Sequence, residues 1–349
     1  MDISIRADRV WGSLIGGAVG DSLGYPVEFD TLEDIYAKFG RKGIRSHVII
    51  NGVAQISDDT QMTIFTADAI LQGLKNNSGD IVESCVECLR RGYQQWAAMQ
   101  VEDYPLTSID NPSLLSHVRE LYENREPGRA CITALLSGEK GSIKTPVNMS
   151  KGCGGVMRVA PIGLCFSAGT APQLIGRIAA EAAAITHGHE LGYITAAALA
   201  CAVHELVNEE DTRVCDAIRH ALSVCKELFP NGQHIEELTA LISKAIELAQ
   251  DDISDAEAIM QLGEGWVAEE ALAIAVFCAI RYENDMEGAV VAAVNHGGDS
   301  DSTGAITGNI VGARVGYNHM PLHLIKKLEL IELLKVYAQK LSEQRYRGV

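Results

Sequence analysis

The sequence predicts an all-α fold, and three observations support that prediction. Apolar residues recur at helical spacing over long stretches, strand-like alternation is nearly absent, and no Pro/Ser-rich linker or low-complexity segment divides the chain. We therefore expect residues 1–349 to form one domain. The expected helices cover residues 8–24, 60–74, 80–98, 172–186, 189–208, 212–228, 234–249, 266–282, 303–317 and 324–343.

Composition limits the classes of partner. The 349 residues include 47% hydrophobic residues, enough for a sizeable core, and 29 basic against 46 acidic residues give a formal net charge of −17. Such a charge opposes binding to nucleic-acid backbones and anionic membranes, because both need neutralising Lys and Arg. The N-terminus lacks a signal-peptide pattern, and no stretch approaches the length of a membrane span. We expect a cytoplasmic protein.

The remaining segments read as loops, with one exception. Residues 45–57 alternate like a short hairpin that turns at Asn51-Gly52, whereas residues 101–115 and 137–157 are rich in loop formers. Most of the nine cysteines lie in apolar helical patterns and read as reduced core residues. The pair Cys85 and Cys88 has the spacing of a zinc or redox motif, but it is isolated within a helical pattern, and we interpret it as structural.

Two of the expected helices carry a stripe of glycines. The positions are Gly12, Gly16, Gly20 and Gly24 in the first helix and Gly304, Gly308, Gly312 and Gly316 in the second. Each helix-interior glycine costs roughly 1 kcal/mol against alanine, so the stripes predict a compensating close approach of backbones. Tight packing alone would explain them. If the stripes face one another or a common neighbour, Glu28 after the first helix converges with Asp299 and Asp301 before the second.

Two helix starts carry paired acids. In "ISDDTQM" Ser57 is a good helix N-cap, and Asp58 and Asp59 fall in the first turn, where the helix dipole favours negative charge. "GGDSDST" repeats this order of small residue, acids and hydroxyl before a helix. Helix capping alone could explain either start. Together they supply four carboxylates and two hydroxyls, whose charges two divalent cations would balance. All these donors are oxygens, which favours Mg²⁺ or Mn²⁺, and the EF-hand ligand pattern is missing. The predicted ligands are Ser57, Asp58, Asp59, Asp299, Asp301 and Ser302.

Five motifs in order resemble the ADP-ribosylglycohydrolase family. They are "GSLIGGAVGDSLGYPVEF", "SDDTQM", "KGCGGVMRVAPIGL", "ITHGHELGYITAAALA" and "NHGGDSDSTGAITGNIVGARVG". The resemblance implies an orthogonal multi-helix bundle around a binuclear Mg²⁺ or Mn²⁺ site. It also implies hydrolysis of the bond between an acceptor and the anomeric carbon of ADP-ribose, with ADP-ribose as product.

The resemblance also assigns roles to residues. The six predicted ligands match the family's metal ligands, and Glu28 matches a glutamate that assists catalysis beside the metals. Either Glu28 or Asp59 can serve as general acid or base. "KGCGGVMR" resembles the loop that wraps the pyrophosphate and distal ribose, whose backbone N–H groups suit phosphate. The substrate-binding residues expected from the resemblance are Cys153, Gly154, Gly155, Val156, Met157, His187, Gly297 and Gly298. Cys153 stands where some members have Asn or Ser.

Some nearby residues allow two readings. His187 and His189 next to Glu190 could bind a metal, although a pair at a helix junction is more often a capping or stacking site. Arg158 could reach a phosphate or form an intramolecular salt bridge. His296 could simply cap or pack behind the acids.

These observations predict a hydrolase acting on an ADP-ribosylated protein. We favour arginine as the acceptor; serine, a nucleic-acid end or an ADP-ribose ester would present the same ADP-ribose. An all-α metal phosphohydrolase normally needs a His-Asp dipeptide, which this sequence lacks. A further alternative is an immunity protein that docks on a cognate ADP-ribosyltransferase.

Overall fold

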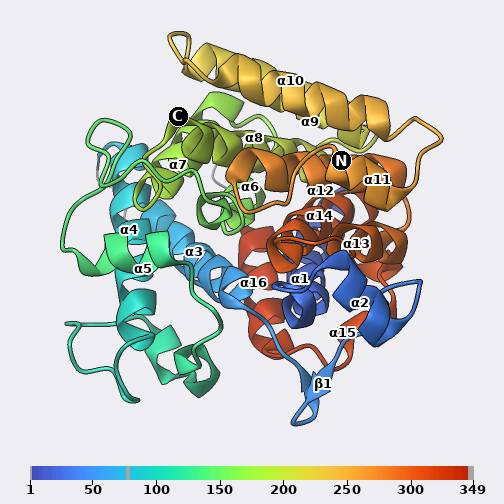
Figure 1. Cartoon of the computed structure of the whole chain (residues 1–349). Helices are drawn as coiled ribbons and strands as arrows, with labels where there is room; N and C mark the ends of the chain where they lie inside the picture. The colour runs from blue at the N-terminus through green and yellow to red at the C-terminus, as the bar shows by residue number, and fades with distance from the viewer. Residues whose placement is uncertain (1, 76–78, 345–349) are drawn as a thin grey trace.

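The computed structural model describes residues 2–75 and 79–344, and its regular structure is nearly all helical, with irregular loops between the helices (Figure 1). The α-helices are α1 (Ile3–Gly24), α2 (Leu32–Phe39), α3 (Asp58–Lys75), α4 (Ile81–Met99), α5 (Arg129–Leu136), α6 (Ala160–Leu164), α7 (Pro172–Ala184), α8 (Glu190–Asn208), α9 (Val214–Leu228), α10 (Ile235–Leu248), α11 (Asp255–Met260), α12 (Ala268–Arg281), α13 (Met286–Val294), α14 (Ser300–Val315), α15 (Leu322–Ile325) and α16 (Ile331–Glu343). The 3-10 helices are η1 (Tyr25–Val27), η2 (Leu114–His117), η3 (Arg119–Tyr122), η4 (Cys153–Gly155) and η5 (Tyr317–His319).

The predicted hairpin is confirmed, although it is very short. Strands β1 (Ile49–Ile50) and β2 (Val53–Ala54) pair antiparallel. Asn51 and Gly52 between them have φ angles of 51° and 90°, as a type I′ turn requires. The turn residues therefore identified the hairpin correctly from sequence.

The predicted helices are present, with one clear correction. Residues 324–343 do not form one helix, because Leu330 adopts a left-handed φ of 56° that separates α15 from α16. The first helix also begins earlier than expected, because Asp2 caps it by accepting a hydrogen bond from the Ser4 N–H at 2.7 Å. Five shorter helices were not predicted: α2, α5, α6, α11 and α13.

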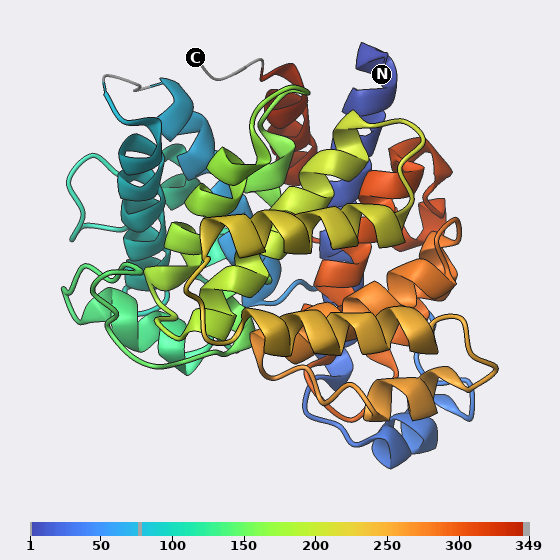
Figure 2. The same ribbon diagram turned by 90° about the horizontal axis from the view of Figure 1, so that it is seen from above.

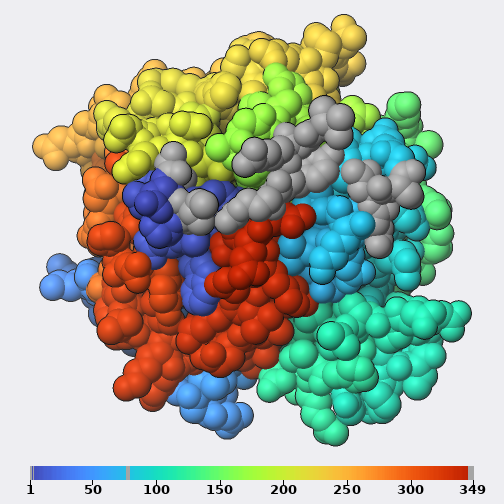
Figure 3. Space-filling view, turned by 180° about the vertical axis from the view of Figure 1, so that it is seen from behind, coloured from blue at the N-terminus to red at the C-terminus, as the bar shows by residue number. Residues whose placement is uncertain are grey.

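The helices enclose α14 and α8 in the interior. Helix α14 packs against α1, α8, α12 and α13, while α9 and α10 cover the outer face above α8 and α12 (Figures 1 and 2). Seen from behind, the C-terminal helix α16 lies against α1 and α3 (Figure 3). All nine cysteines lie in the described part of the chain, and each is a thiol without a disulfide.

Helix α8 corrects one expectation. It is 19 residues long with a mean hydropathy of 1.3, so by length and composition it passes as a membrane span. However, 83% of that window is buried inside the protein, which is the property of a core helix.

The glycine stripes of α1 and α14 face one another. The two helices run antiparallel, and the facing pairs are Gly12–Gly312, Gly16–Gly308, Gly20–Gly304 and Gly24–Ser300. At each of these α1 glycines a Cβ atom would overlap the facing carbonyl group. Ser13 Oγ donates to the Asn309 carbonyl at 2.8 Å, and Asn309 Nδ2 donates to the Ser13 carbonyl at 2.9 Å. This contact fixes the end of α1 beside the start of α14.

We predict that Gly20→Ala lowers the free energy of unfolding by roughly 1–3 kcal/mol, because the added methyl group must push two backbones apart. An unhindered helical Gly→Ala change would instead stabilise by up to about 1 kcal/mol. Urea denaturation measures the difference. Gly79→Ala is the control, since a Cβ atom added at Gly79 would have no neighbouring atom within 4 Å. A Gly20→Ala protein as stable as the wild type would contradict the close packing.

Candidate active site

Three segments bring acidic side chains together at one buried place. Asp58 and Asp59 begin α3, Asp299 and Asp301 begin α14, and Glu28 follows η1 at the end of α1. All five are buried, with exposed fractions of 2–8%. Burial raises the pKa of each carboxyl group, and the charge of Asp301 raises the pKa values of the other four further. The glycine contact therefore produces the convergence that the sequence predicted.

Asp21 is a member of this cluster that the sequence analysis missed. It is fully buried on α1, and its carboxylate accepts hydrogen bonds from the backbone N–H groups of Ser57 at 3.0 Å and Thr60 at 3.1 Å, and from the Thr60 hydroxyl. Burial and the charge of Asp301 raise its pKa to about 7. The available signal was a single acid within residues 10–24, the largely apolar, glycine-striped part of the helix. Asp21 ties the start of α3 to α1.

Capping hydrogen bonds form at both helix starts, whose acids also lie together. Ser57 Oγ accepts from the Asp59 N–H at 3.2 Å, and Asp299 Oδ1 accepts from the Ser302 N–H at 3.3 Å. Asp301 Oδ1 accepts from the same Ser302 N–H at 2.9 Å. Helix N-termini stabilise negative charge, so each of these helix starts offsets part of the desolvation energy of its buried acids.

Two carboxyl oxygens of the cluster have no hydrogen-bond partner, and no basic side chain of the described residues pairs with its acids. Glu28 Oε2 and Asp59 Oδ2 are buried without any hydrogen-bond partner. Within residues 2–75 and 79–344, no Lys, Arg or His forms an ion pair with any of the six acids, Asp21 included. A set of carboxylate oxygens with unsatisfied members fits a hard divalent cation.

The carboxylates are not already arranged around a single point. Among the described residues, no group of three His, Cys, Asp or Glu side chains has the geometry of a metal cage. Instead, Asp58 Oδ2 accepts from the Gly128 N–H at 3.2 Å, and Asp299 Oδ2 accepts from the Cys153 thiol at 2.7 Å. Each of these two oxygens can bind a cation only by giving up or sharing its present donor.

The predicted substrate loop lies directly beside the acids. Cys153 reaches Asp299 through its thiol, and Ser302 Oγ lies 3.9 Å from Met157 Sδ. The N–H groups of Val156 and Met157 both donate to the Cys153 carbonyl, at 2.8 and 3.1 Å. Those two groups are therefore engaged within the turn. The N–H groups of Gly154 and Gly155 lie in the first turn of η4, where helix geometry leaves N–H groups available.

His187 lies behind this loop. It is 2% exposed, its Nδ1 is 2.8 Å from Thr186 Oγ1, and a Cβ atom on Gly154 would lie 3.0 Å from its ring. Burial, with a smaller effect of Arg158, lowers its pKa to about 3, so the ring is neutral. The structure thus gives His187 contact with the inner side of the loop.

The other ambiguous residues have structural roles. His189 caps α8 by accepting from the Leu191 N–H at 3.1 Å and packs against the His234 ring. Arg158 is fully buried, donates to Thr186 Oγ1 at 2.7 Å and lies over the Tyr93 ring. Its guanidinium is therefore held within the core, and it forms no salt bridge with any residue that the structure describes.

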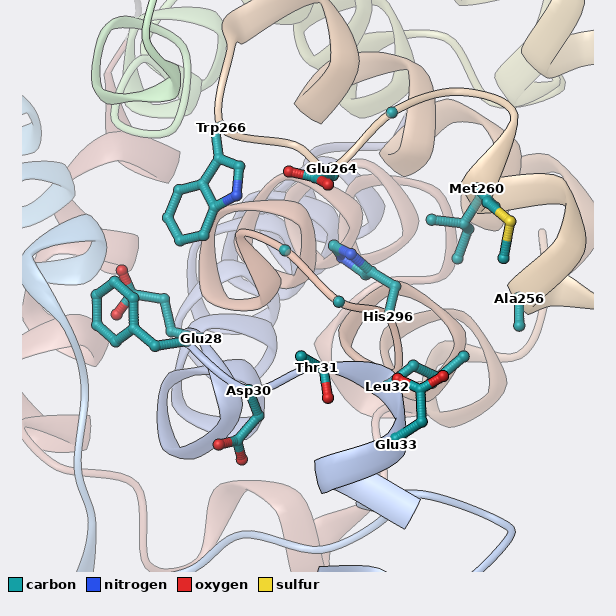
Figure 4. A pocket seen from close by; sticks show the side chains of 15 residues that line it. Glu28, Asp30, Thr31, Leu32, Glu33, Ala256, Met260, Glu264, Trp266 and His296 are labelled. Atoms are coloured by element: carbon teal, nitrogen blue, oxygen red, sulfur yellow. The ribbon is translucent and has the colours of Figure 1, made fainter. Parts of the chain in front are cut away.

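A cavity of about 650 Å³ opens next to the acids (Figure 4). Residues 28–33, α11, residues 263–266 and residues 296–298 line it, so Gly297 and Gly298 form part of its wall. His296 also lines the cavity, with its Nε2 atom 2.9 Å from Thr303 Oγ1. Because Glu28 belongs to both groups, the cavity adjoins the acid cluster.

Comparison with known proteins agrees with this architecture. The family model described as ADP-ribosylglycohydrolase matches residues 2–348. A solved structure titled "ADP-ribosylglycohydrolase-related protein complex" superposes with a TM-score of 0.65 at 23% identity, covering 98% of this chain and 100% of that chain. This likeness shows the shared fold.

Two curated relatives carry functional names. The ADP-ribosyl-[dinitrogen reductase] glycohydrolase of Rhodospirillum rubrum is 23% identical over 93% of this chain and 91% of that protein. The ADP-ribosylhydrolase ARH3 of Bos taurus is 29% identical, over 55% of this chain and 57% of that protein. The match to bovine ARH3 thus spans little more than half of either protein. These matches support a glycohydrolase that releases ADP-ribose from modified acceptors.

The metal-free protein should show an unusual pH dependence that originates at Glu28. Burial first, and then the charge of Asp301, raise the Glu28 pKa from 4.5 to about 10, so the folded state keeps a proton that the unfolded state releases. The contribution of protonated Glu28 to the free energy of unfolding is complete below pH 4.5 and is lost as the pH rises towards 10. Relative to Glu28→Gln, the free energy of unfolding of the wild type should fall by up to about 1.4 kcal/mol per pH unit between pH 5 and 8.

Urea denaturation of chelator-treated protein at several pH values measures this difference. The exposed substitution Glu83→Gln is the control, and its stability should follow the wild-type curve. A constant difference between wild type and Glu28→Gln across this range would show that Glu28 ionises normally.

Proposed function

The chain belongs to the ADP-ribosylglycohydrolase family, and we propose that it uses Mg²⁺ or Mn²⁺ to hydrolyse the bond between ADP-ribose and arginine side chains of an acceptor protein. ADP-ribose is then the released product. The observation on which this proposal rests is the buried group of carboxylates, with unsatisfied oxygens, beside a glycine-rich turn and an open cavity.

The six predicted ligand residues would hold the cations. They are Ser57, Asp58 and Asp59 at the start of α3, and Asp299, Asp301 and Ser302 at the start of α14. When bound, two divalent cations supply charge that balances the acids and polarise the reacting oxygens. The donor set supports hard cations, because carboxylate and hydroxyl oxygens are the ligands that such cations prefer.

The protein's own groups supply binding and proton transfer. The N–H groups of Gly154 and Gly155 suit a pyrophosphate oxygen, since the net charge of −17 offers no bulk attraction for phosphate. Glu28 and Asp59 each have a buried oxygen without a partner, so either carboxylate can accept or return a proton at the acceptor nitrogen or at the attacking water. The raised pKa of Glu28 favours a protonated side chain in the metal-free state.

Arginine is the proposed acceptor because the motif set resembles the dinitrogen-reductase type, and the Rhodospirillum rubrum relative bears that name. Docking on a cognate ADP-ribosyltransferase is the rival function. The matched family and both named relatives are hydrolases, so hydrolysis is the function that the comparisons favour. A phosphohydrolase is disfavoured for the same reason.

A panel of ADP-ribosylated substrates tests the proposal. Peptides modified on arginine or serine and a nucleic acid modified at its end should be assayed for released ADP-ribose, with Mg²⁺ or Mn²⁺ and after chelation. We expect fastest release from arginine and loss of at least a hundredfold in rate on chelation. Full turnover without metal, or no release from any substrate, would refute the proposal.

Asp301→Asn tests the proposed metal site in the same assay. Asparagine keeps the shape of aspartate and caps a helix equally well, but it removes one of the charges available to balance two dications. The variant should stay folded, lose activity by orders of magnitude and bind Mn²⁺ more weakly in calorimetry. An active variant with unchanged metal affinity would mean that Asp301 is only a helix-start residue.

A further inference from the structure

The cavity beside the acid cluster is lined mainly by acidic side chains. Its polar lining side chains include the carboxyl groups of Glu28, Asp30, Glu33 and Glu264, together with Thr31, Trp266 and His296 (Figure 4). No Lys or Arg is among the lining residues. A ligand that matches such walls must be rich in donors.

Two buried polar atoms in this lining have no hydrogen-bond partner. Glu28 Oε2 and His296 Nδ1 are both buried and unsatisfied, on side chains that are at most 8% exposed. The Thr303 hydroxyl lies 2.8 Å from the Ala293 carbonyl, to which it donates, so it accepts from the His296 Nε2–H at 2.9 Å. That leaves a bare lone pair on His296 Nδ1. A buried polar atom without a partner is costly, and an entering donor removes that cost.

The charge at the mouth of the cavity selects a cation. Asp30 is already paired with Lys38 at 2.6 Å. Glu33 and Glu264 are exposed and form no ion pair within the described part of the chain. Their negative charge repels the pyrophosphate of ADP-ribose and attracts a positively charged group.

An apolar shelf lies beside these acids. Phe29 stacks on Trp266 with ring centroids 5.9 Å apart and planes 17° apart, and Met260 is 74% exposed. Lysine and arginine bury their aliphatic stems on such surfaces and place their charged ends near aromatic faces. A shelf next to two carboxylates therefore matches both parts of one long cationic side chain.

We propose that this cavity binds an unmodified lysine or arginine side chain of the acceptor protein, close to the ADP-ribosylated residue. The inference rests on the proposed function, because Glu28 and Gly298 join the cavity to the acid cluster where the modified residue is placed. Glu33 and Glu264 set the charge preference. The cavity thus selects among acceptor proteins by the sequence around the modification.

Paired peptides test this selection. Two peptides carry the same ADP-ribose linkage and differ only in flanking residues, either lysine or glutamine. The wild type should hydrolyse the lysine peptide with a kcat/KM about tenfold higher, and Glu33→Gln/Glu264→Gln should bring that ratio to within about twofold of one. Glu83→Gln, which removes an exposed acid on α4 outside the cavity lining, should keep the wild-type ratio.

Calorimetry with ADP-ribose separates the possible occupants. The double variant should bind ADP-ribose with an affinity within about twofold of the wild type. Weaker ADP-ribose binding would show that the cavity holds the nucleotide and would overturn the inference, as would a wild-type ratio near one. Absence of hydrolysis of both peptides by the wild type would instead refute the proposed function.

Discussion

The close contact between α1 and α14 is the constraint on which the site depends. Because four facing positions lack side chains on α1, and three of their partners on α14 are also glycines, the two backbones meet along most of their length. The antiparallel direction then places the end of α1, which continues into Glu28, beside the start of α14 with Asp299 and Asp301. Asp21 extends the same contact to α3 through the Ser57 and Thr60 N–H groups. One packing choice thus positions every acid.

Concentrating these acids costs stability in the metal-free protein. Burial raises the pKa values of all six carboxyl groups, and the charge of Asp301 raises those of the other five further, so some retain protons at neutral pH. The N-termini of α3 and α14 offset part of the desolvation energy of these acids. One oxygen of Glu28 and one of Asp59 nevertheless remain buried without a hydrogen-bond partner. Strain of this kind is typical of sites arranged for a ligand. A bound dication would convert the repulsion into attraction.

Much of this arrangement was readable from the sequence because its signals are local or periodic. Helical spacing predicted the long helices, Asn51-Gly52 predicted the hairpin, and the glycine stripes predicted the contact that joins Glu28 to Asp299 and Asp301. Helix α13 was missed because it is short and its residues after Glu287 include no further polar side chain, which leaves no periodicity. The break at Leu330 depends on a backbone angle that leucine rarely adopts.

Other features required the three-dimensional arrangement. The roles of Arg158, which binds Thr186 Oγ1, and of Asp21, which holds α3, come from residues far apart in the chain. The cavity is built from four separate segments, and those formed by α11 and residues 263–266 belong to no motif found in the sequence. Only the fold shows that Phe29 stacks on Trp266.

The most direct test of the central claim is an anomalous-scattering map from crystals grown with Mn²⁺. The account predicts manganese peaks between the starts of α3 and α14, in contact with Asp59 and Asp301, with Asp299 turned away from Cys153 and Asp58 turned away from Gly128. Manganese bound elsewhere, or none at saturating Mn²⁺ with these hydrogen bonds intact, would contradict the claim that the glycine contact assembles a metal site.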